Sequence, residues 1–417
     1  MFEKLPRKKV FRDPLYGYIT VEYKIISDLI DTLEIQRLRR ISQLSGVSRV
    51  FQTAEHSRFT HALGAYQMAN LVISNVDGMG NVSEYEKVVF LCAALLHDIG
   101  HGPYSHAFES VTTTPHEQMT VNIILSDKTD VNKVLSKCPT LASDVAGVIS
   151  HSGKYPLIES LVSSQLDVDR MDYLSRDAYF TGAEYGHIDY YRILRSMKIV
   201  NNQVVVKASG VHSVESYLMS RYHMYFQVYY HPVSKRFECL LEGIYARIKD
   251  LYEQGVKLDA DIESLINVIN DSSDIESYIN LDDTYVNGFI KTLTKSSDPI
   301  LSKLCKAFER RHIFEFIDLA FEEGEERVNQ IRQKYDNEYK KYLYQEVKVS
   351  GSAYNGSNVE TIGIKMLMPN GNIVPLDTFS PIIKSLVPSS YKTIERIYYF
   401  EDWYGKCNCS WRCTWRC

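Results

Sequence analysis

The feature that most constrains the fold of this chain is a helical spacing of apolar residues that runs from about Ile25 to Tyr335. Apolar side chains recur every three or four positions, and stops that contain glycine or proline divide the stretch into separate helices. The longest strictly apolar run, Val88 to Leu96, has nine residues, whereas a membrane span needs about 20. The pattern therefore predicts a mostly α protein that does not cross a membrane.

The charge balance argues against a protein dedicated to duplex DNA. The 417 residues include 47 Lys and Arg against 52 Asp and Glu, a net charge of −5, whereas such proteins typically carry a positive excess. We therefore expect no membrane partner and no requirement for nucleic acid. The start, MFEKLPRKKV, has no apolar signal-peptide core. Together with the singly scattered Cys92, Cys138, Cys239 and Cys305, which are typical of reduced thiols, this predicts a cytoplasmic location.

Local patterns divide the chain into four parts. Residues 1–250 are expected to form a helical core, with a small hairpin in KIVNNQVVVKA and a long helix from about Ser213 to Ile248 kinked at Pro232. Residues 251–340 form a helical extension, and strand-like runs predict a small α+β subdomain over 341–405. For the Cys/Trp-rich tail, 406–417, a loosely ordered or locally packed end is favoured over a zinc or partner site. In the core we expect helices near residues 23–32, 34–44, 57–75, 84–97, 116–125, 140–150, 163–179 and 187–197.

Four polar residues stand in contexts that packing alone does not favour. His97 and Asp98 end the long apolar run, where two polar groups are costly to bury unless something compensates both. His61 in HSRFTHALG and Asp169 in QLDVDRMDYLSRD complete a set of two imidazoles and two carboxylates. Such a mixed N/O set suits one divalent Fe, Mn or Zn ion, with positions left for water and a phosphate oxygen. Each residue alone is more commonly an ordinary helix residue, so only the combination indicates a metal.

A series of motifs over about residues 8–232 resembles those of the HD-domain phosphohydrolases, and specifically the deoxynucleoside triphosphate (dNTP) triphosphohydrolases among them. The motifs are FRDPLYGYI, DTLEIQRLRRISQL, HSRFTHALG, HDIGHGPYSH, HEQ, DVDRMDYLSRD and RYHMYFQVYYHP. The resemblance implies an HD-type core over 1–250 with an N-terminal regulatory and oligomerisation segment. It also implies that one divalent metal per subunit is held by His61, His97, Asp98 and Asp169, while Mg or Mn accompanies the nucleotide phosphates. The implied reaction is hydrolysis of a dNTP to deoxynucleoside and inorganic triphosphate.

Further residues are candidates for substrate contact. The resemblance gives proton-transfer or phosphate-contact roles to His101, His106, His116 and Glu109. Guanidinium groups match phosphate geometry, which makes Arg58, Arg170 and Arg221 candidates for the triphosphate. Asp169, Tyr173 and Asp177 lie at i, i+4 and i+8 on one helix stripe, which for the tyrosine alone is more simply a core face. By resemblance, the deoxyribose would be held by Gln43, Leu44, Tyr173, Asp177 and Tyr229, and crowding of the 2′ position by Leu44 and Tyr229 would exclude ribose.

A regulatory site is implied in the same way. Family members that are activated by guanine nucleotides use positions that correspond here to Lys9, Val10, Asp31, Gln36 and Arg39. By composition alone these are surface residues of helices and of an extended segment. The resemblance predicts activation by GTP, dGTP or another dNTP, in a homo-oligomer for which a tetramer is favoured. It leaves open whether the enzyme controls the dNTP pool or serves antiviral defence.

Two other functions fit the same residues. One is an HD phosphohydrolase of another nucleotide or of single-stranded nucleic acid, which product analysis would separate from a dNTP triphosphohydrolase. The other is a catalytically silent nucleotide sensor whose output is assembly with a partner. The complete metal set argues against lost catalysis, and measurement of turnover distinguishes the two.

Overall fold

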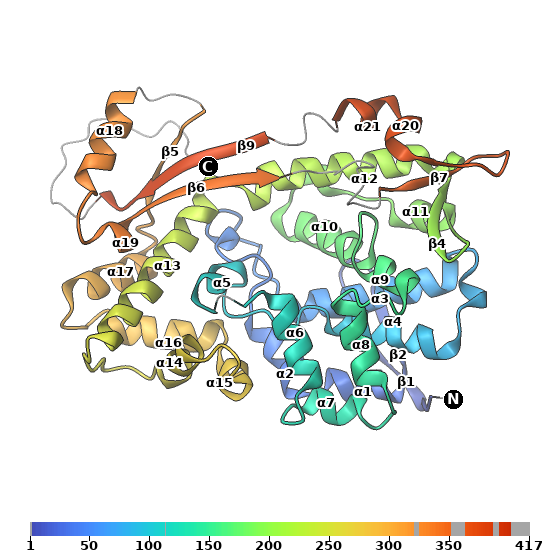
Figure 1. The fold of residues 1–417 in the computed structure, drawn as a ribbon, viewed down its shortest axis with the longest axis horizontal. Helices are drawn as coiled ribbons and strands as arrows, with labels where there is room; N and C mark the ends of the chain where they lie inside the picture. The colour runs from blue at the N-terminus through green and yellow to red at the C-terminus, as the bar shows by residue number, and fades with distance from the viewer. Residues whose placement is uncertain (1, 113, 321–324, 352–362, 387–391, 402–417) are drawn as a thin grey trace.

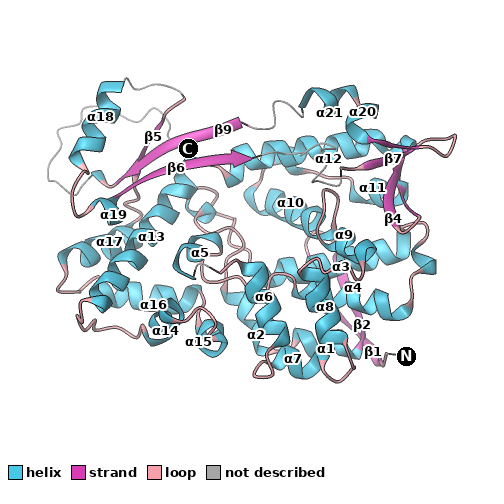
Figure 2. Cartoon of the chain, in the orientation of Figure 1, coloured by secondary structure: helices cyan, strands magenta, loops and turns pink. Residues whose placement is uncertain are grey.

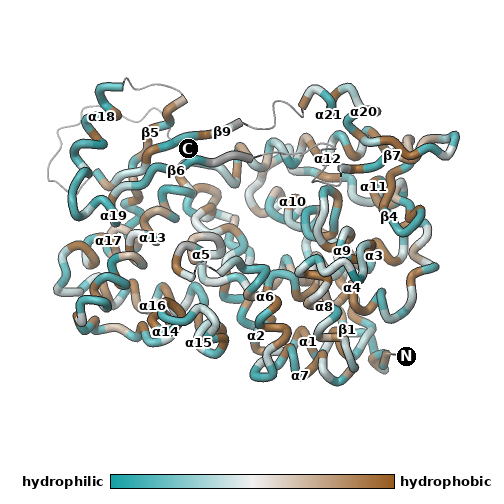
Figure 3. Tube along the Cα trace, in the orientation of Figure 1, coloured by the Kyte–Doolittle hydropathy of each residue, from teal (hydrophilic) through white to brown (hydrophobic). Residues whose placement is uncertain are grey.

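The computed structural model describes residues 2–112, 114–320, 325–351, 363–386 and 392–401 (Figure 1). The Cys/Trp-rich tail predicted over 406–417 lies outside these residues. Helices make up most of the described chain, and strands occur in three small sheets (Figure 2). Most helices alternate between hydrophobic and hydrophilic residues along their length, as expected when one face is buried (Figure 3). The mostly α fold is confirmed.

The first half of the chain contains β1 (Lys4–Asp13), β2 (Gly17–Tyr23), α1 (Lys24–Ile30), α2 (Leu33–Arg37), α3 (Arg58–Asn75), α4 (Glu84–Leu96), α5 (His106–Thr112), α6 (His116–Leu125), α7 (Asp130–Leu135), α8 (Leu141–Ile149), α9 (Pro156–Val162), α10 (Val168–Thr181) and α11 (Tyr190–Ser196). The second half contains β3 (Met197–Val200), β4 (Gln203–Lys207), α12 (Val211–Met224), α13 (Pro232–Glu253), α14 (Glu263–Asn270), α15 (Ile275–Asn280), α16 (Asp283–Leu293), α17 (Pro299–Arg310), β5 (Glu315–Asp318), α18 (Glu325–Lys334), α19 (Lys340–Leu343), β6 (Tyr344–Gly351), β7 (Lys365–Leu367), β8 (Ile373–Pro375), α20 (Leu376–Phe379), α21 (Pro381–Leu386) and β9 (Lys392–Tyr399).

Helix α4 lies in the centre of the core. Its start is fixed by a capping box, in which the Ser83 side chain accepts from the backbone of Glu86 while the Glu86 carboxylate accepts from the backbone of Ser83. Every residue from Val88 to Leu96 is buried. The helix ends just before Gly100, where an added Cβ would lie 2.2 Å from the carbonyl oxygen of His116. Only glycine therefore allows the start of α6 to approach the end of α4 so closely.

The helix expected over 34–44 is shorter than predicted. Helix α2 ends at Arg37 and is followed by a short 3-10 turn over Leu38–Arg40. Beyond it, the carboxylate of Asp283 accepts a hydrogen bond of 2.9 Å from the backbone N–H of Ser42, a group that a continuing helix would have used internally. Residues 43 and 44 consequently lie in a loop rather than on a helix.

The predicted hairpin and the break in the long helix are both present. Asn201 and Asn202 have φ angles of 50° and 59° and join β3 to β4, as a tight primed turn requires. The long helix continues from α12 through a π-helical turn over Tyr225–Tyr229 and restarts as α13 at Pro232. A proline with no N–H to donate is best placed at such a first helical position.

The C-terminal strands do not pair only with one another. Strand β9 lies between β6 and β5, and β5 falls within 251–340, which was expected to be helical throughout. Strand β7 pairs with β4 in parallel, with Val206 opposite Met366, so it extends the hairpin sheet. The chain beyond Tyr342 is therefore tied into two sheets, one of which runs beside α13 (Figure 1).

Within the part of the chain that the structure describes, no helix combines the length and the apolar composition needed to cross a bilayer. The cysteines described, Cys92, Cys138, Cys239 and Cys305, are all free thiols.

Candidate metal centre and substrate cavity

Four predicted metal ligands converge at one point although they come from three separate helical segments. His61 lies on α3, His97 and Asp98 follow α4, and Asp169 lies on the first turn of α10. The Nε2 atoms of His61 and His97 are 3.2 Å apart, and the Oδ1 atom of Asp169 is 3.1 Å from the first and 3.3 Å from the second. Asp98 Oδ1 lies 3.4 Å from His97 Nε2. His61, His97 and Asp169 therefore surround one common centre, and Asp98 lies beside it in contact with both imidazoles.

The hydrogen bonds of the two imidazoles suit a metal. His61 directs its Nδ1 at the carboxylate of Asp172 at 2.8 Å, and His97 directs its Nδ1 at the carbonyl oxygen of Ala94 at 3.0 Å. Donation from both Nδ1 atoms leaves both Nε2 lone pairs facing the centre, as in histidines that ligate metals. Two nitrogens and two carboxylates then make a donor set that fits Fe, Mn or Zn.

Protonation among these groups follows from their contacts. Burial lowers the pKa of His61, but hydrogen bonds to Asp169 and Asp172 outweigh burial and raise the pKa to about 10. Burial raises the pKa of Asp169, and the two imidazoles reverse this effect and hold the pKa well below its usual range. A cation at the centre would take the place of the His61 proton, so metal binding and protonation compete.

The residues that hold His61 in place were not predicted from the sequence. The carboxylate of Asp172, fully buried, accepts from His61 Nδ1 and from Arg176 Nε and Nη2, the latter two at 3.0 Å. Burial raises the pKa of Asp172, but Arg176 and His61 more than offset this and lower the pKa to about 2. A signal was available, since Asp172 lies one helical turn after Asp169, on the side of α10 that faces α3.

The candidate proton-transfer residues lie next to the metal centre. The guanidinium of Arg58 donates to Asp98 and, at 2.8 Å, to Ser105 Oγ. The rings of His101 and His116 are stacked with centroids 3.8 Å apart, and His116 Nδ1 is 2.6 Å from the carboxylate of Glu109. Burial, and then the nearby Arg58, keep the pKa of His101 well below its usual range, so this imidazole is neutral at pH 7. His106 begins α5, and its side chain lies outside the described part of the structure.

A cavity of about 470 Å³ opens beside the metal centre. It contains ten of the predicted site residues in its lining: Gln43, Leu44, Arg58, Asp98, His101, His116, Asp169, Tyr173, Asp177 and Tyr229. The volume lies within the range of about 300–1,000 Å³ that small-molecule sites occupy. The i, i+4, i+8 stripe of α10 therefore lines this cavity, and Tyr173 also packs against the core.

Two predicted phosphate contacts do not line the cavity. Arg170 forms an ion pair with Asp167, the N-cap of α10, and Arg221 donates to the Gln165 side chain at 2.9 Å. The guanidinium of Arg221 also lies 5.6 Å from the centroid of the Tyr225 ring, which does line the cavity. Both arginines thus stand behind the lining and would have to change partners to reach a phosphate.

Part of the cavity beyond the metal centre combines predicted residues with others that were not predicted. Asp177 is held by His56 Nε2 at 2.8 Å and by the hydroxyl of Tyr229 at 2.7 Å. The wall beyond them comes from the start of α13 and from the C-terminal strands, through Ser234, Lys235, Glu238, Val347, Arg396 and Tyr398. The C-terminal sheet is therefore part of the site, although it is distant in sequence.

Comparison with known proteins places this site in a family. Residues 58–177 match the HD domain, and residues 188–261 match the HD associated region. The protein YwfO of Bacillus subtilis, itself uncharacterized, is 40% identical over 96% of this chain and 94% of its own. The chain belongs to the HD-domain family. All four candidate metal ligands lie within the matched HD domain.

Two further relatives support the assignment of this HD-domain protein. A phosphohydrolase from Bacteroides thetaiotaomicron has the same fold, with a TM-score of 0.82, 28% identity, and coverage of 94% of this chain and 100% of the other. A deoxynucleoside triphosphate triphosphohydrolase SAMHD1 homolog of Dictyostelium discoideum is 27% identical over 74% of this chain and 60% of its own. The fold is therefore that of an HD-domain phosphohydrolase, which indicates a hydrolase with a metal centre.

The predicted regulatory residues of the HD-domain protein lie on its surface in two contacting pairs. Lys9 on β1 forms an ion pair of 3.0 Å with Asp31, which follows α1. Arg39 donates to the side chain of Gln36 at 2.8 Å, and its guanidinium lies over the Phe59 ring. The side chain of Val10 is exposed. Val10, Asp31 and Arg39 are thus exposed, whereas Lys9 and Gln36 are partly buried and the Gln36 amide donates to the carbonyl oxygen of Ile30 at 2.7 Å.

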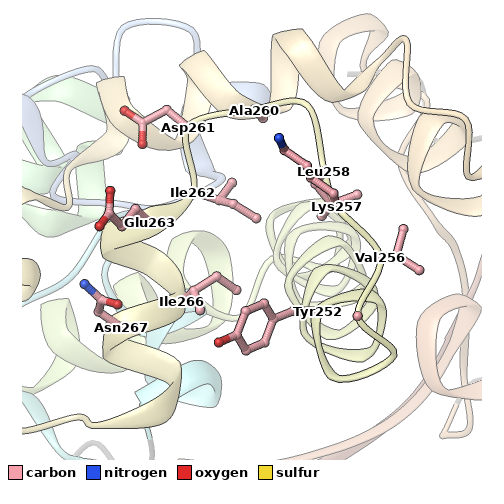
Figure 4. A pocket seen from close by; sticks show the side chains of 11 residues that line it. Tyr252, Val256, Lys257, Leu258, Ala260, Asp261, Ile262, Glu263, Ile266 and Asn267 are labelled. Atoms are coloured by element: carbon pink, nitrogen blue, oxygen red, sulfur yellow. The ribbon is translucent and has the colours of Figure 1, made fainter.

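A second hollow of about 630 Å³ lies between the end of α13 and the start of α14 (Figure 4). Its described lining includes Tyr252, Leu258, Ile262 and Ile266 and contains no histidine. Its lining shares no residue with the candidate metal ligands or with the first cavity.

Proposed function

We propose that this protein hydrolyses dNTPs to deoxynucleoside and inorganic triphosphate in a metal-dependent reaction. One observation carries the proposal: the cluster of His61, His97 and Asp169, with Asp98 in contact with His97, opens into a cavity whose other lining residues suit a deoxynucleoside. The similarity to relatives named deoxynucleoside triphosphate triphosphohydrolases supports the substrate class.

The metal is assigned to His61, His97, Asp98 and Asp169, where a divalent cation would neutralise phosphate charge and activate water. Arg58 keeps Asp98 oriented through their ion pair and presents positive charge to a phosphate in the cavity. His116, oriented by Glu109, is the candidate to give a proton to the leaving oxygen. His101 is neutral and stacks on His116, so it fixes the plane of that ring.

The sugar is assigned to the other end of the cavity. Asp177 accepts from His56 and Tyr229 and still has lone pairs for a sugar hydroxyl, because a carboxylate offers about four acceptor sites. Gln43 lines the cavity, and its amide oxygen is buried with no hydrogen-bond partner in the described structure. A buried acceptor of this kind is expected where a bound ligand supplies the donor. Leu44 and Tyr229 present bulk beside them, which would exclude a 2′-hydroxyl.

The proposal also includes activation of the hydrolase by a nucleotide at a second site. GTP, dGTP or another dNTP is proposed to bind at Lys9, Val10, Asp31, Gln36 and Arg39 and to favour a homo-oligomer, with a tetramer expected. Separation of Lys9 from Asp31 and of Gln36 from Arg39 would release two cations and two acceptors for the phosphates and the base of such a nucleotide.

Chromatography of the products formed from each dNTP tests the proposal. Wild type, His97→Ala and the control His187→Ala are incubated with Mn²⁺, with and without GTP or dGTP, and the mass of the assembly is measured in parallel. His187 is a suitable control because its side chain is 78% exposed. We expect wild type and His187→Ala to release triphosphate and His97→Ala to release none.

The other outcomes identify the alternatives. Release of orthophosphate, or shortening of single-stranded oligonucleotides, would indicate an HD phosphohydrolase with another substrate. Binding of dNTPs without turnover under any activator would indicate a nucleotide sensor.

A further inference from the structure

The turn of the N-terminal hairpin contacts the buried residues that hold His61. We define the N-terminal hairpin as β1 and β2, Lys4–Tyr23. Its strands pair up to Asp13 opposite Gly17, and Gly17 closes the turn with a φ of 72°, which favours glycine. Much of β1 is exposed to solvent, but Asp13 at its end is 5% exposed. The hairpin therefore has an outer part at the surface and a tip inside the protein.

Two side chains of the tip contact the residues that orient His61. The hydroxyl of Tyr16 donates to Asp172 Oδ1 at 2.7 Å. Asp13 Oδ2 accepts from Arg176 Nη1 at 2.9 Å, while Asp13 Oδ1 accepts from the backbone N–H groups of Leu15 and Tyr16 and so shapes the turn.

Asp172 is thereby held from three sides. His61 occupies Oδ2, Tyr16 occupies Oδ1, and Arg176 bridges both oxygens. Arg176 and Asp172 are both 0% exposed, so no water competes for these positions. Burial raises the pKa of the Tyr16 hydroxyl well above its usual value, which keeps it protonated and able to donate. A charged network with every member paired has one favoured geometry, and loss of a member leaves its partners unsatisfied.

We infer that Tyr16 and Asp13 are positioning residues of the metal centre: they fix Asp172 and Arg176, which set the ring plane and the tautomer of His61. The N-terminal hairpin is then an outer wall of the active site as well as a surface element. The inference rests on the proposed metal centre. The same strand connects the surface to that centre, since β1 carries Lys9 and Val10 and ends at Asp13.

The chain offers a closely matched control. Tyr66 on α3 is 1% exposed, and its hydroxyl donates at 3.2 Å to the carbonyl oxygen of Thr20 on β2. Tyr66→Phe and Tyr16→Phe thus each remove one buried hydroxyl that joins the hairpin to the core. Only the Tyr16 hydroxyl contacts Asp172.

The experiment is a titration of the chelator-stripped full chain with Mn²⁺, together with urea denaturation of each variant. Loss of an outer partner typically costs about 10–100-fold in metal affinity, and Tyr16 acts through one intermediate. We therefore expect Tyr16→Phe to raise the dissociation constant for Mn²⁺ about tenfold. Asp13→Asn, which keeps the shape of the turn but removes the negative charge that pairs with Arg176, should raise it as well, and Tyr66→Phe should leave it unchanged.

Equal Mn²⁺ affinity of Tyr16→Phe, Asp13→Asn and wild type would overturn the inference and leave the proposed function intact. An equal loss of affinity in Tyr66→Phe and Tyr16→Phe would also overturn it, because the hairpin would then act only through general stability. A wild-type chain that binds no Mn²⁺ would overturn the proposed function and this inference together.

Discussion

Replacement of Gly64 by Ala is predicted to damage the metal centre, although the same change in a helix normally stabilises a protein. Gly64 lies in α3 one turn after His61, where side chains of α10 pack against the helix. An added Cβ would lie 2.0 Å from Asp172 Oδ1 and 2.4 Å from Arg176 Nη2. Ordinary contact begins near 3.4 Å, so the carboxylate would have to move by about 1.4 Å.

The magnitude follows from that displacement. Asp172 Oδ2 is 2.8 Å from His61 Nδ1, and a movement of this size carries it beyond hydrogen-bonding distance. We expect the dissociation constant for Mn²⁺ to rise about 10–100-fold. Overpacking costs about 1–3 kcal/mol, while alanine in place of helical glycine gains about 0.8–1.0 kcal/mol. The free energy of unfolding should therefore fall by up to about 2 kcal/mol.

Gly288→Ala is the matched control, because Gly288 lies within α16 and its added Cβ would meet no atom within 4 Å. Urea denaturation should show Gly288→Ala to be about 0.8–1.0 kcal/mol more stable than wild type, with Mn²⁺ affinity unchanged. If Gly64→Ala gains stability to the same extent and binds Mn²⁺ like wild type, the close approach of α3 and α10 does not position His61, and the reasoning fails.

Three other predictions concern proton and substrate contacts. Glu109→Gln should lower kcat at least about tenfold with little change in KM, because general acid–base groups contribute about 10²–10⁴-fold and His116 would lose its orienting carboxylate; steady-state kinetics on a dNTP that show an unchanged kcat would contradict this role. Tyr229→Phe should lower kcat/KM for dNTPs at least about tenfold, since a hydrogen bond to a charged group such as Asp177 is worth about 1.5–3 kcal/mol; the exposed Tyr179→Phe serves as control, and equal effects of both changes would refute it. The pKa of His61 is raised from 6.5 to about 10, so its contribution to the stability of the stripped protein is fully present below pH 6.5 and is lost as the pH rises through about 10. Mn²⁺ affinity should change in the opposite direction and increase with pH; urea midpoints and Mn²⁺ titrations at pH 6 and pH 10 measure both, and a midpoint that does not change would argue against the buried His61 imidazolium.

Local sequence signals were sufficient to predict those parts of the structure that a short segment determines by itself. The two asparagines of the β3–β4 turn tolerate positive φ angles, so the hairpin was predictable from them. The glycines that follow Asp98 end α4 in any context, which brings His97 and Asp98 to the end of a buried helix. The spacing of Asp169, Tyr173 and Asp177 likewise determined that these side chains share one stripe.

Contacts between residues far apart in the chain determined those features of the site that were not predicted. The backbone of Ser42 is held by Asp283, 241 positions away, and this contact removes Gln43 and Leu44 from the predicted helix and places them in the cavity wall. Arg170 pairs with the nearby Asp167, and Arg221 pairs with the distant Gln165. These partners compete with a phosphate for the two guanidinium groups, and the spacing of residues in the sequence does not reveal them. The sheet that closes the cavity places β9 between β5 and β6, so its strand order does not follow their order in the chain.

The sequence by itself determined which residues can carry the chemistry, because side-chain type and helical period are properties of short segments. Only the tertiary structure decided how those residues are held. The contact of Asp172 with His61, the tip of the N-terminal hairpin and the C-terminal wall each depend on the approach of segments that are far apart in the chain. Packing of the whole core sets that approach, and no local pattern encodes it.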